Sequence, residues 1–297
     1  MNSNLYTHQD SNILKTWGLM TGFFLLIIAL GWFISYWYDS SFILYIAVFF
    51  AIFMNILSYW FSDKIVLKMH KARLATREEY FDLWTVTENL SITAGLPMPR
   101  LYVIDDPSPN AFATGRNKKH SVVAVTTGLL QILDRSELEG VVAHELAHIG
   151  NRDILLATVA VILAGFASII ADMFLRTTIV GDRNNRASGP LMVIGIIFIV
   201  LAPIFATLIR LAISRKREFL ADSTGALLTR YPEGLANALK KISQHAVPLR
   251  TSHDATAHMF ISNPFGGKKM KGFHKLFMTH PPTEERIAAL LGTGAVK

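Results

Sequence analysis

Long windows of apolar residues limit what this 297-residue chain can fold into. Hydrophobic residues make up 51 % of it, yet the charged residues gather outside four windows. These windows are Trp17 to Tyr38, Phe42 to Phe61, Ile154 to Leu175 and Leu191 to Ile213. Each approaches or exceeds the roughly 20 residues that an α-helix needs to cross the hydrocarbon core of a bilayer. The sequence therefore predicts four transmembrane helices, and the first is too long for a cleaved signal peptide, so we expect a retained anchor.

The basic residues next to these windows predict an orientation. Asp39 is the only charged residue in the loop between the first two windows. By contrast, a cluster of lysines and arginines follows the second window, and another follows the fourth. By the positive-inside rule both termini and the large middle segment face the cytosol, although Arg176, Arg183 and Arg186 between the last two windows argue mildly the other way. The net charge of +7 is mostly this excess, which suits a lipid bilayer as partner and shows no pattern for nucleic acid.

A short motif with metal-binding spacing precedes the third window. His144 and His148 are four residues apart, so on a helix both imidazoles lie on one face and can share a metal, while Glu145 lies beside it as a general base. Ser136 and Glu139 predict a capping box at the start of this helix. The motif predicts one zinc ion per chain. Because the chain contains no cysteine, the ligand atoms of this ion must be nitrogen and oxygen.

The predicted topology restricts where a third zinc ligand can come from. A hairpin of the third and fourth windows returns the chain to the face where the histidines lie, and the helix expected over Arg215 to Leu228 offers Glu218 first. Asp222 lies four residues later on the same face. One of the two can bind zinc while the other orients a ligand imidazole, and residue order alone does not decide which.

The segment between the second window and the motif predicts a small sheet. Arg100 to Ile104 and Ser121 to Thr126 alternate as strands do, and Leu74 to Leu90 is expected to be an amphipathic helix. Asn110 to Thr114 is a candidate edge strand on which an extended substrate adds by backbone hydrogen bonds. The alternative is an ordinary turn with Phe112 buried. The segment Thr251 to Gly272 is weakly patterned and is expected either over the site or on the membrane.

Four motifs together carry a resemblance. The chain reads His144-Glu-Leu-Ala-His148-Ile-Gly-Asn151-Arg-Asp153, then Arg217-Glu218-Phe-Leu-Ala-Asp222, His280-Pro-Pro-Thr-Glu-Glu-Arg286, and Asn110-Ala111-Phe112. With these motifs and the four spans in matching order, the chain resembles the HtpX family of bacterial membrane zinc endopeptidases over nearly its whole length.

The resemblance implies a role for each of these positions. His144, His148 and Glu218 would be the zinc ligands, Glu145 the general base, and Asp222 a support behind the ligands, with Asn151 at a position of less certain role. His280 and Arg286 would steady the oxyanion of the tetrahedral intermediate. Asn110, Ala111 and Phe112 would form the substrate-binding edge. The lysine-rich segment Ile261 to Gly272 departs from the family pattern.

The expected fold is a mainly α integral membrane protein with a cytosolic zincin-like α+β catalytic domain. Its parts are 1–63 with the first two spans, 64–153 with the sheet and the motif helix, 154–213 with the second hairpin, and 214–297 with the third ligand and the C-terminal motif. The resemblance implies a protease of the bacterial inner membrane, with its active site facing the cytosol, that cuts misfolded or damaged membrane proteins in quality control under stress. Self-cleavage is a further hypothesis.

Three alternative functions start from the same residues. A prenyl-protein endopeptidase shares the zinc motifs, but such enzymes enclose a chamber with more transmembrane helices. A non-catalytic zinc scaffold has no use for an acid between the two histidines and usually closes its site with four protein ligands. A zinc transporter needs metal-binding side chains within its spans, and the four windows contain no histidine.

Overall fold

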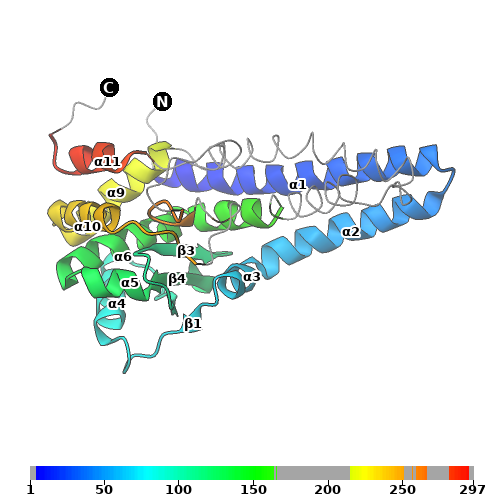
Figure 1. Cartoon of the computed structure of the whole chain (residues 1–297). Coiled ribbons are helices and arrows are strands. Elements are labelled where there is room, and N and C mark those ends of the chain that lie inside the picture. The colour runs from blue at the N-terminus through cyan, green and yellow to red at the C-terminus, as the bar shows by residue number, and fades with distance from the viewer. Residues whose placement is uncertain are drawn as a thin grey trace.

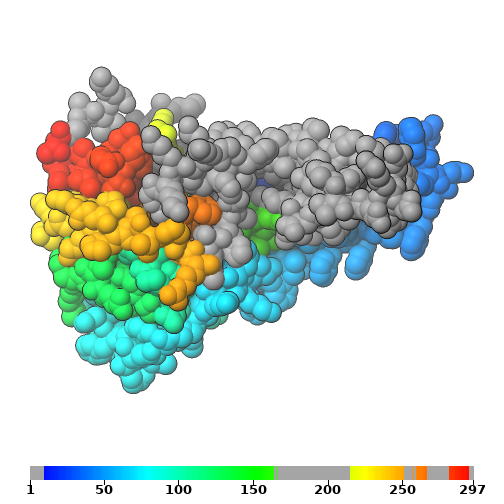
Figure 2. Space-filling view, in the orientation of Figure 1, coloured from blue at the N-terminus to red at the C-terminus, as the bar shows by residue number. Residues whose placement is uncertain are grey.

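The computed structural model describes residues 5–163, 165, 215–250, 256, 259–265 and 281–293. Its first two helices, α1 (Leu5–Trp37) and α2 (Ser41–Trp60), form an antiparallel hairpin whose tip lies far from the sheet (Figure 1). By length and composition both are able to cross a membrane, over Asp10–Trp37 and Ser41–Trp60. The tip of the hairpin forms the narrow end of the molecule in Figure 2. Large side chains on its surface, such as Tyr36 (78 % exposed) and Phe49 (71 % exposed), are available to lipid.

The predicted third and fourth spans fall largely outside the described residues. Only the start of the third is described, as a helix over Asp153–Leu163. This helix bends by 82° from the one before it, and Arg152 at the bend has a φ of 59°, in the left-handed region. The rest of the third window and the whole fourth window lie in the part that the structure does not describe.

Between the hairpin and the sheet the chain departs from the predicted amphipathic helix. After α3 (Ser62–Met69) comes a short strand, β1 (Arg73–Leu74), and only then α4 (Phe81–Ala94). The prediction of a helix from Leu74 was wrong because Leu74 pairs with Tyr102 of the sheet. The helix was predicted to end at Leu90, but α4 continues to Ala94 and stops at Gly95, which has the positive φ of 63° that glycine adopts without strain.

The described residues contain one small mixed sheet in the order β1-β2-β4-β3. Its main strands are β2 (Arg100–Ile104), β3 (Ala111–Gly115) and β4 (Ser121–Thr126). β2 and β4 run parallel, and β3 pairs antiparallel with β4, with Ala113 opposite Val123. The predicted strands are thus confirmed, and β3 lies at an edge of the sheet.

A group of helices packs around the motif helix α6 (Arg135–Gly150), which contacts α4, α9, α10 and β3 (Figure 1). The other helices of this group are α5 (Thr127–Ile132), α9 (Arg215–Thr229), α10 (Pro232–Gln244) and α11 (Thr283–Leu290), and a short 3-10 turn, η1, covers Lys118–His120. The capping box of α6 was predicted two residues too late. Asp134, rather than Ser136, accepts a hydrogen bond from the Glu137 N–H, and the Glu137 carboxylate accepts one from the Asp134 N–H.

Candidate metal centre and active site

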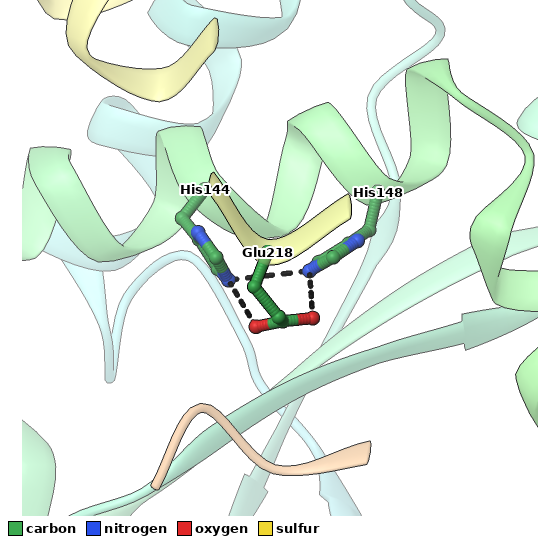
Figure 3. A group of neighbouring side chains, drawn as sticks. All are labelled: His144, His148 and Glu218. Carbon is green, nitrogen blue, oxygen red and sulfur yellow. Dashed lines mark hydrogen bonds and ion pairs between the residues drawn. The ribbon is translucent and has the colours of Figure 1, made fainter. Parts of the chain in front are cut away.

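Three potential metal ligands from two helices meet in one place. His144 and His148 project from the same face of α6, and Glu218 reaches them from the first turn of α9 (Figure 3). The two Nε2 atoms are 3.2 Å apart. The Glu218 carboxylate lies 3.6 Å from Nε2 of His148 and 3.9 Å from Nε2 of His144. All three ligand atoms fall within 4.8 Å of one another.

These distances fit a zinc ion. Nitrogen and oxygen ligands lie about 2.0–2.2 Å from zinc, so two of them at tetrahedral angles are separated by about 3.3–3.6 Å. The observed separations of 3.2, 3.6 and 3.9 Å are close to these values. Three protein ligands leave a fourth position open, which is the arrangement of catalytic rather than structural zinc.

A glycine lets the two ligand-bearing helices approach. Gly225 of α9 faces the backbone of α6 at His144, and a Cβ atom there would lie only 3.1 Å from the His144 backbone nitrogen. Glycine at this position therefore allows α9 to lie close enough for Glu218 to reach the histidines.

Asp222 holds His144 from behind. Its Oδ1 lies 2.8 Å from Nδ1 of His144, so the imidazole points Nε2 toward Glu218 and His148. Arg286 of α11 donates two hydrogen bonds to Asp222, of 2.8 and 2.6 Å, and a third to the carbonyl of Ile261 at 3.1 Å. The two candidate acids therefore have different positions. Glu218 lies near Nε2 of both histidines, whereas Asp222 contacts only one of them, His144, at Nδ1.

Asp153, for which the sequence predicted no role, is the carboxylate partner of the other histidine, His148. Its Oδ2 lies 3.1 Å from Nδ1 of His148. Its Oδ1 accepts hydrogen bonds from Asn12 at 2.7 Å and from Arg217 at 3.3 Å. The end of α1 that carries Asn12 is thereby tied to the metal site. The only sequence signal was an acid five residues after His148, and the bend at Arg152 is what turns it back.

The buried charges around the two ligand histidines give them different pKa values. Burial lowers the pKa of His144 to about 4, because its hydrogen bond to Asp222 compensates only in part and Arg286 lies close by. Burial also lowers the pKa of His148, but the hydrogen bond to Asp153 and the charges of Glu218 and Glu145 outweigh it and raise that pKa to about 9. Burial raises the pKa of Asp222, yet the Arg286 guanidinium overcomes it and holds the value at about 2. The site is therefore rich in negative charge around His148.

The ligands open into a pocket that also contains Glu145. Its apolar lining comes from β3, from the helix after α6 and from residues 259–261, as Ala113, Ile154, Ala157, Met259 and Ile261. Glu145 is buried and lines the same pocket as His144, His148 and Glu218. A carboxylate beside the metal ligands, at the wall of an apolar pocket, is placed to exchange protons with a water molecule and a substrate.

The predicted substrate edge is partly covered by the chain itself. The Ile261 N–H donates to the carbonyl of Ala111 at 2.9 Å, and Asn110 exchanges side-chain hydrogen bonds with the backbone of Ser262. The Phe112 ring is buried against Phe260. The substrate-binding role of Asn110, Ala111 and Phe112 stays a prediction.

Further along β3 the edge faces the metal site. The Thr126 N–H donates to the Asn110 carbonyl, and ladder bonds alternate along an antiparallel pair. The backbone groups of Ala113 therefore point away from β4, and Ala113 lines the pocket of the metal ligands.

The remaining predicted residues have different outcomes. Asn151 is buried at the end of α6, where its carbonyl accepts a hydrogen bond from Asn12, and no hydrogen bond joins its side chain to the ligand histidines. Arg286 lies on the Nδ1 side of His144, 3.5 Å from that atom, and its oxyanion role stays a prediction. His280 lies outside the described residues.

Comparisons with known proteins agree with this geometry. The model of a family described as Peptidase family M48 matches residues 79–293. Relatives named "Protease HtpX homolog" include one from Thermoanaerobacter pseudethanolicus, 45 % identical over 96 % of this chain and 97 % of the relative. Another, from Tropheryma whipplei, is 46 % identical over 98 % and 99 %, and one from Pyrococcus furiosus is 50 % identical over 81 % and 83 %.

A solved structure resembles the fold. The crystal structure of S. mikatae Ste24p aligns with a TM-score of 0.51 at 19 % identity, covering 96 % of this chain and 67 % of that one. At this identity the likeness concerns the fold alone.

Proposed function

Because this chain belongs to peptidase family M48 and is a membrane metalloprotease, we propose that it is a zinc endopeptidase that hydrolyses peptide bonds of misfolded or damaged membrane proteins. One observation carries the proposal: two imidazoles and a carboxylate converge within 4.8 Å at the wall of a pocket that holds Glu145. The catalytic part combines residues 64–153 and 214–297, which the predicted second hairpin, residues 154–213, separates in the sequence.

His144, His148 and Glu218 hold the zinc ion in this proposal. The carboxylates behind the two imidazoles support this assignment, since ligating histidines usually donate their second ring N–H to such a group. When bound, zinc supplies Lewis acidity, which lowers the pKa of a water molecule and polarises the scissile carbonyl. Arg286 acts through Asp222 as a positioning residue for His144.

Glu145 is the general base. It takes a proton from the attacking water and then passes that proton to the nitrogen of the departing amine, so that the C–N bond breaks with a neutral leaving group. Its position between the ligand histidines on α6 keeps it beside the reacting atoms in every step.

Substrate binds as an added strand along β3 at Ala113. The backbone groups that point outward there support an extended peptide of any sequence. Residues 261–262 already pair with Asn110 and Ala111, so substrate strand pairing begins beyond them. Apolar side chains of an unfolded membrane protein fit the lining that Ala113, Ile154 and Met259 provide.

The membrane arrangement is part of the proposal. α1 and α2 act as the first two of four spans, the protein resides in a bacterial inner membrane, and the active site faces the cytosol. Stress response and self-cleavage of the chain's own loops belong to the same proposal. The lysines and arginines that follow the second and fourth windows support this orientation.

Cleavage in proteoliposomes tests the proposal. The substrates are a single-pass membrane protein with a destabilised domain, its folded parent, and a prenylated peptide. We expect cleavage of the destabilised protein well ahead of the folded one, lost with a zinc chelator and in Glu145→Gln. Glu139→Gln, a matched loss of charge on the outer face of α6 where Glu139 pairs with Arg135, keeps the activity. Preference for the prenylated peptide would instead support the prenyl-protein alternative.

A further inference from the structure

A second pocket, away from the metal ligands, lies where the hairpin of α1 and α2 meets the loop after β3. One wall is apolar and aromatic and comes from α1 and α2. The other wall is cationic and comes from residues 116–119 and the bend after α6. The aromatic and cationic residues of the lining are Trp17, Tyr59, Arg116, Lys118, Lys119 and Arg152. No acidic residue is among the described residues that line it.

The four cations are not neutralised within the described part of the chain. None of Arg116, Lys118, Lys119 and Arg152 forms an ion pair with a described carboxylate. Burial and the positive charge of Arg152 lower the pKa of the Lys118 ammonium, so these charges repel one another. A cluster of this kind gains free energy when an anion binds to it.

The aromatic wall places the pocket at the depth of lipid headgroups. Trp17 and Tyr59 stack with their ring centroids 6.3 Å apart, and each lies toward the end of a candidate membrane span that faces the catalytic part. Tryptophan and tyrosine favour the interface between bilayer and water. Arg116 lies over the ring of Trp60 at 4.3 Å, which holds one of the cations at the same level.

We propose that this pocket binds the phosphate-containing headgroup of an anionic phospholipid. The cationic loop takes the phosphate, and the half-exposed Trp17 and its apolar neighbours on α1 receive the start of the acyl chains. A basic pocket between membrane helices is a recurrent way to recognise anionic lipids. Ile154 lines both this pocket and the pocket of the metal ligands, so the bound lipid lies beside the catalytic centre.

Native mass spectrometry of the full-length protein in detergent tests the proposal. The probes are dioctanoyl phosphatidylglycerol, dioctanoyl phosphatidylcholine, and inorganic phosphate as a competitor. We expect the protein to retain phosphatidylglycerol in preference to phosphatidylcholine. The variant Arg116→Gln/Lys118→Gln removes two contacts and is expected to weaken phosphatidylglycerol binding about 30-fold. Lys64→Gln/Lys68→Gln removes two charges from α3, next to the membrane but outside the pocket, and is expected to bind nearly as wild type.

Other outcomes overturn the proposal. Equal retention of both lipids shows that the negative charge of the headgroup is not recognised. An equal loss in the two double variants shows that positive charge in general, and not this pocket, attracts the lipid. Displacement of the lipid by inorganic phosphate at the same concentration shows a site for a free anion. If the pocket variant does not fold, the exposed Lys119→Glu replaces it, and unchanged phosphatidylglycerol binding in that charge reversal contradicts the proposal.

Discussion

Replacing Asp153 with asparagine tests whether the unpredicted acid behind His148 shapes the metal site. The change keeps the size of the side chain but removes the charge that faces Nδ1 of His148 at 3.1 Å and Arg217 at 3.3 Å. Loss of such a partner typically costs a metal site 10- to 100-fold in affinity, or about 1.4–2.7 kcal/mol. We expect a loss in this range wherever His148 is already neutral.

The pH dependence of zinc binding separates two effects of the same carboxylate. A protonated imidazole cannot bind zinc, and the metal-free His148 has a pKa of about 9, so a proton competes at every pH below that value. Wild-type affinity should therefore rise about tenfold per pH unit from pH 7 to pH 9.

Asp153→Asn lowers the pKa of His148, because it removes the strongest of the interactions that raise it. The variant should consequently show a shallower pH dependence, and its loss of affinity should be smaller at pH 7 than at pH 9. Competition with a chromophoric chelator measures both values, and Asp105→Asn, an exposed acid outside the site, is the matched control. Equal affinities of Asp153→Asn and wild type at pH 9 would refute the role assigned to Asp153.

Three further substitutions probe packing, charge and the substrate edge. Gly225→Ala places a methyl group 3.1 Å from the backbone of His144. It should destabilise the protein by about 1–3 kcal/mol and weaken zinc binding. Thermal unfolding measures the loss, and the control is Gly18→Ala, whose methyl group meets no described atom within 4 Å. Arg286→Gln leaves Asp222 buried without its cation and should lower the free energy of unfolding by about 3–5 kcal/mol. The double variant Arg286→Gln/Asp222→Asn should lose less stability. Chemical denaturation measures both, and a greater loss in the double variant would contradict the pairing of Arg286 with Asp222. Ala113→Pro removes one outward N–H of β3 and should lower kcat/KM about 10- to 100-fold. The zinc content should stay at the wild-type level. A loss of zinc in this variant would contradict a role limited to substrate binding.

Local patterns predicted the catalytic helix and the main strands. The spacing of His144 and His148 needs only one turn of helix, and strands β2 and β4 are marked by alternation within a few residues. Glu218 was predicted among two candidates because chain topology returns α9 to the motif. The structure separates Glu218 from Asp222 through the packing of α9 at Gly225, a contact between distant segments that no local pattern contains.

The missed features depend on contacts between distant parts of the chain. Asp153 faces His148 only because the chain bends by 82° at Arg152, and Asn12 reaches it from a helix 141 residues earlier. Leu74 leaves the predicted helix because Tyr102 pairs with it. Residues 261–262 come from a weakly patterned segment, and they are ordered by the edge of β3 and by Arg286 rather than by their own propensity.

The most direct test of the zinc endopeptidase is Glu145→Gln, with zinc content and cleavage of an unfolded protein such as casein measured on the same detergent-purified sample. Bound zinc at one ion per chain in both proteins, with cleavage in wild type and none in Glu145→Gln, is the predicted result. Cleavage that survives the substitution would contradict the role of Glu145 as general base, and wild-type protein that cleaves without zinc would contradict the metal centre itself.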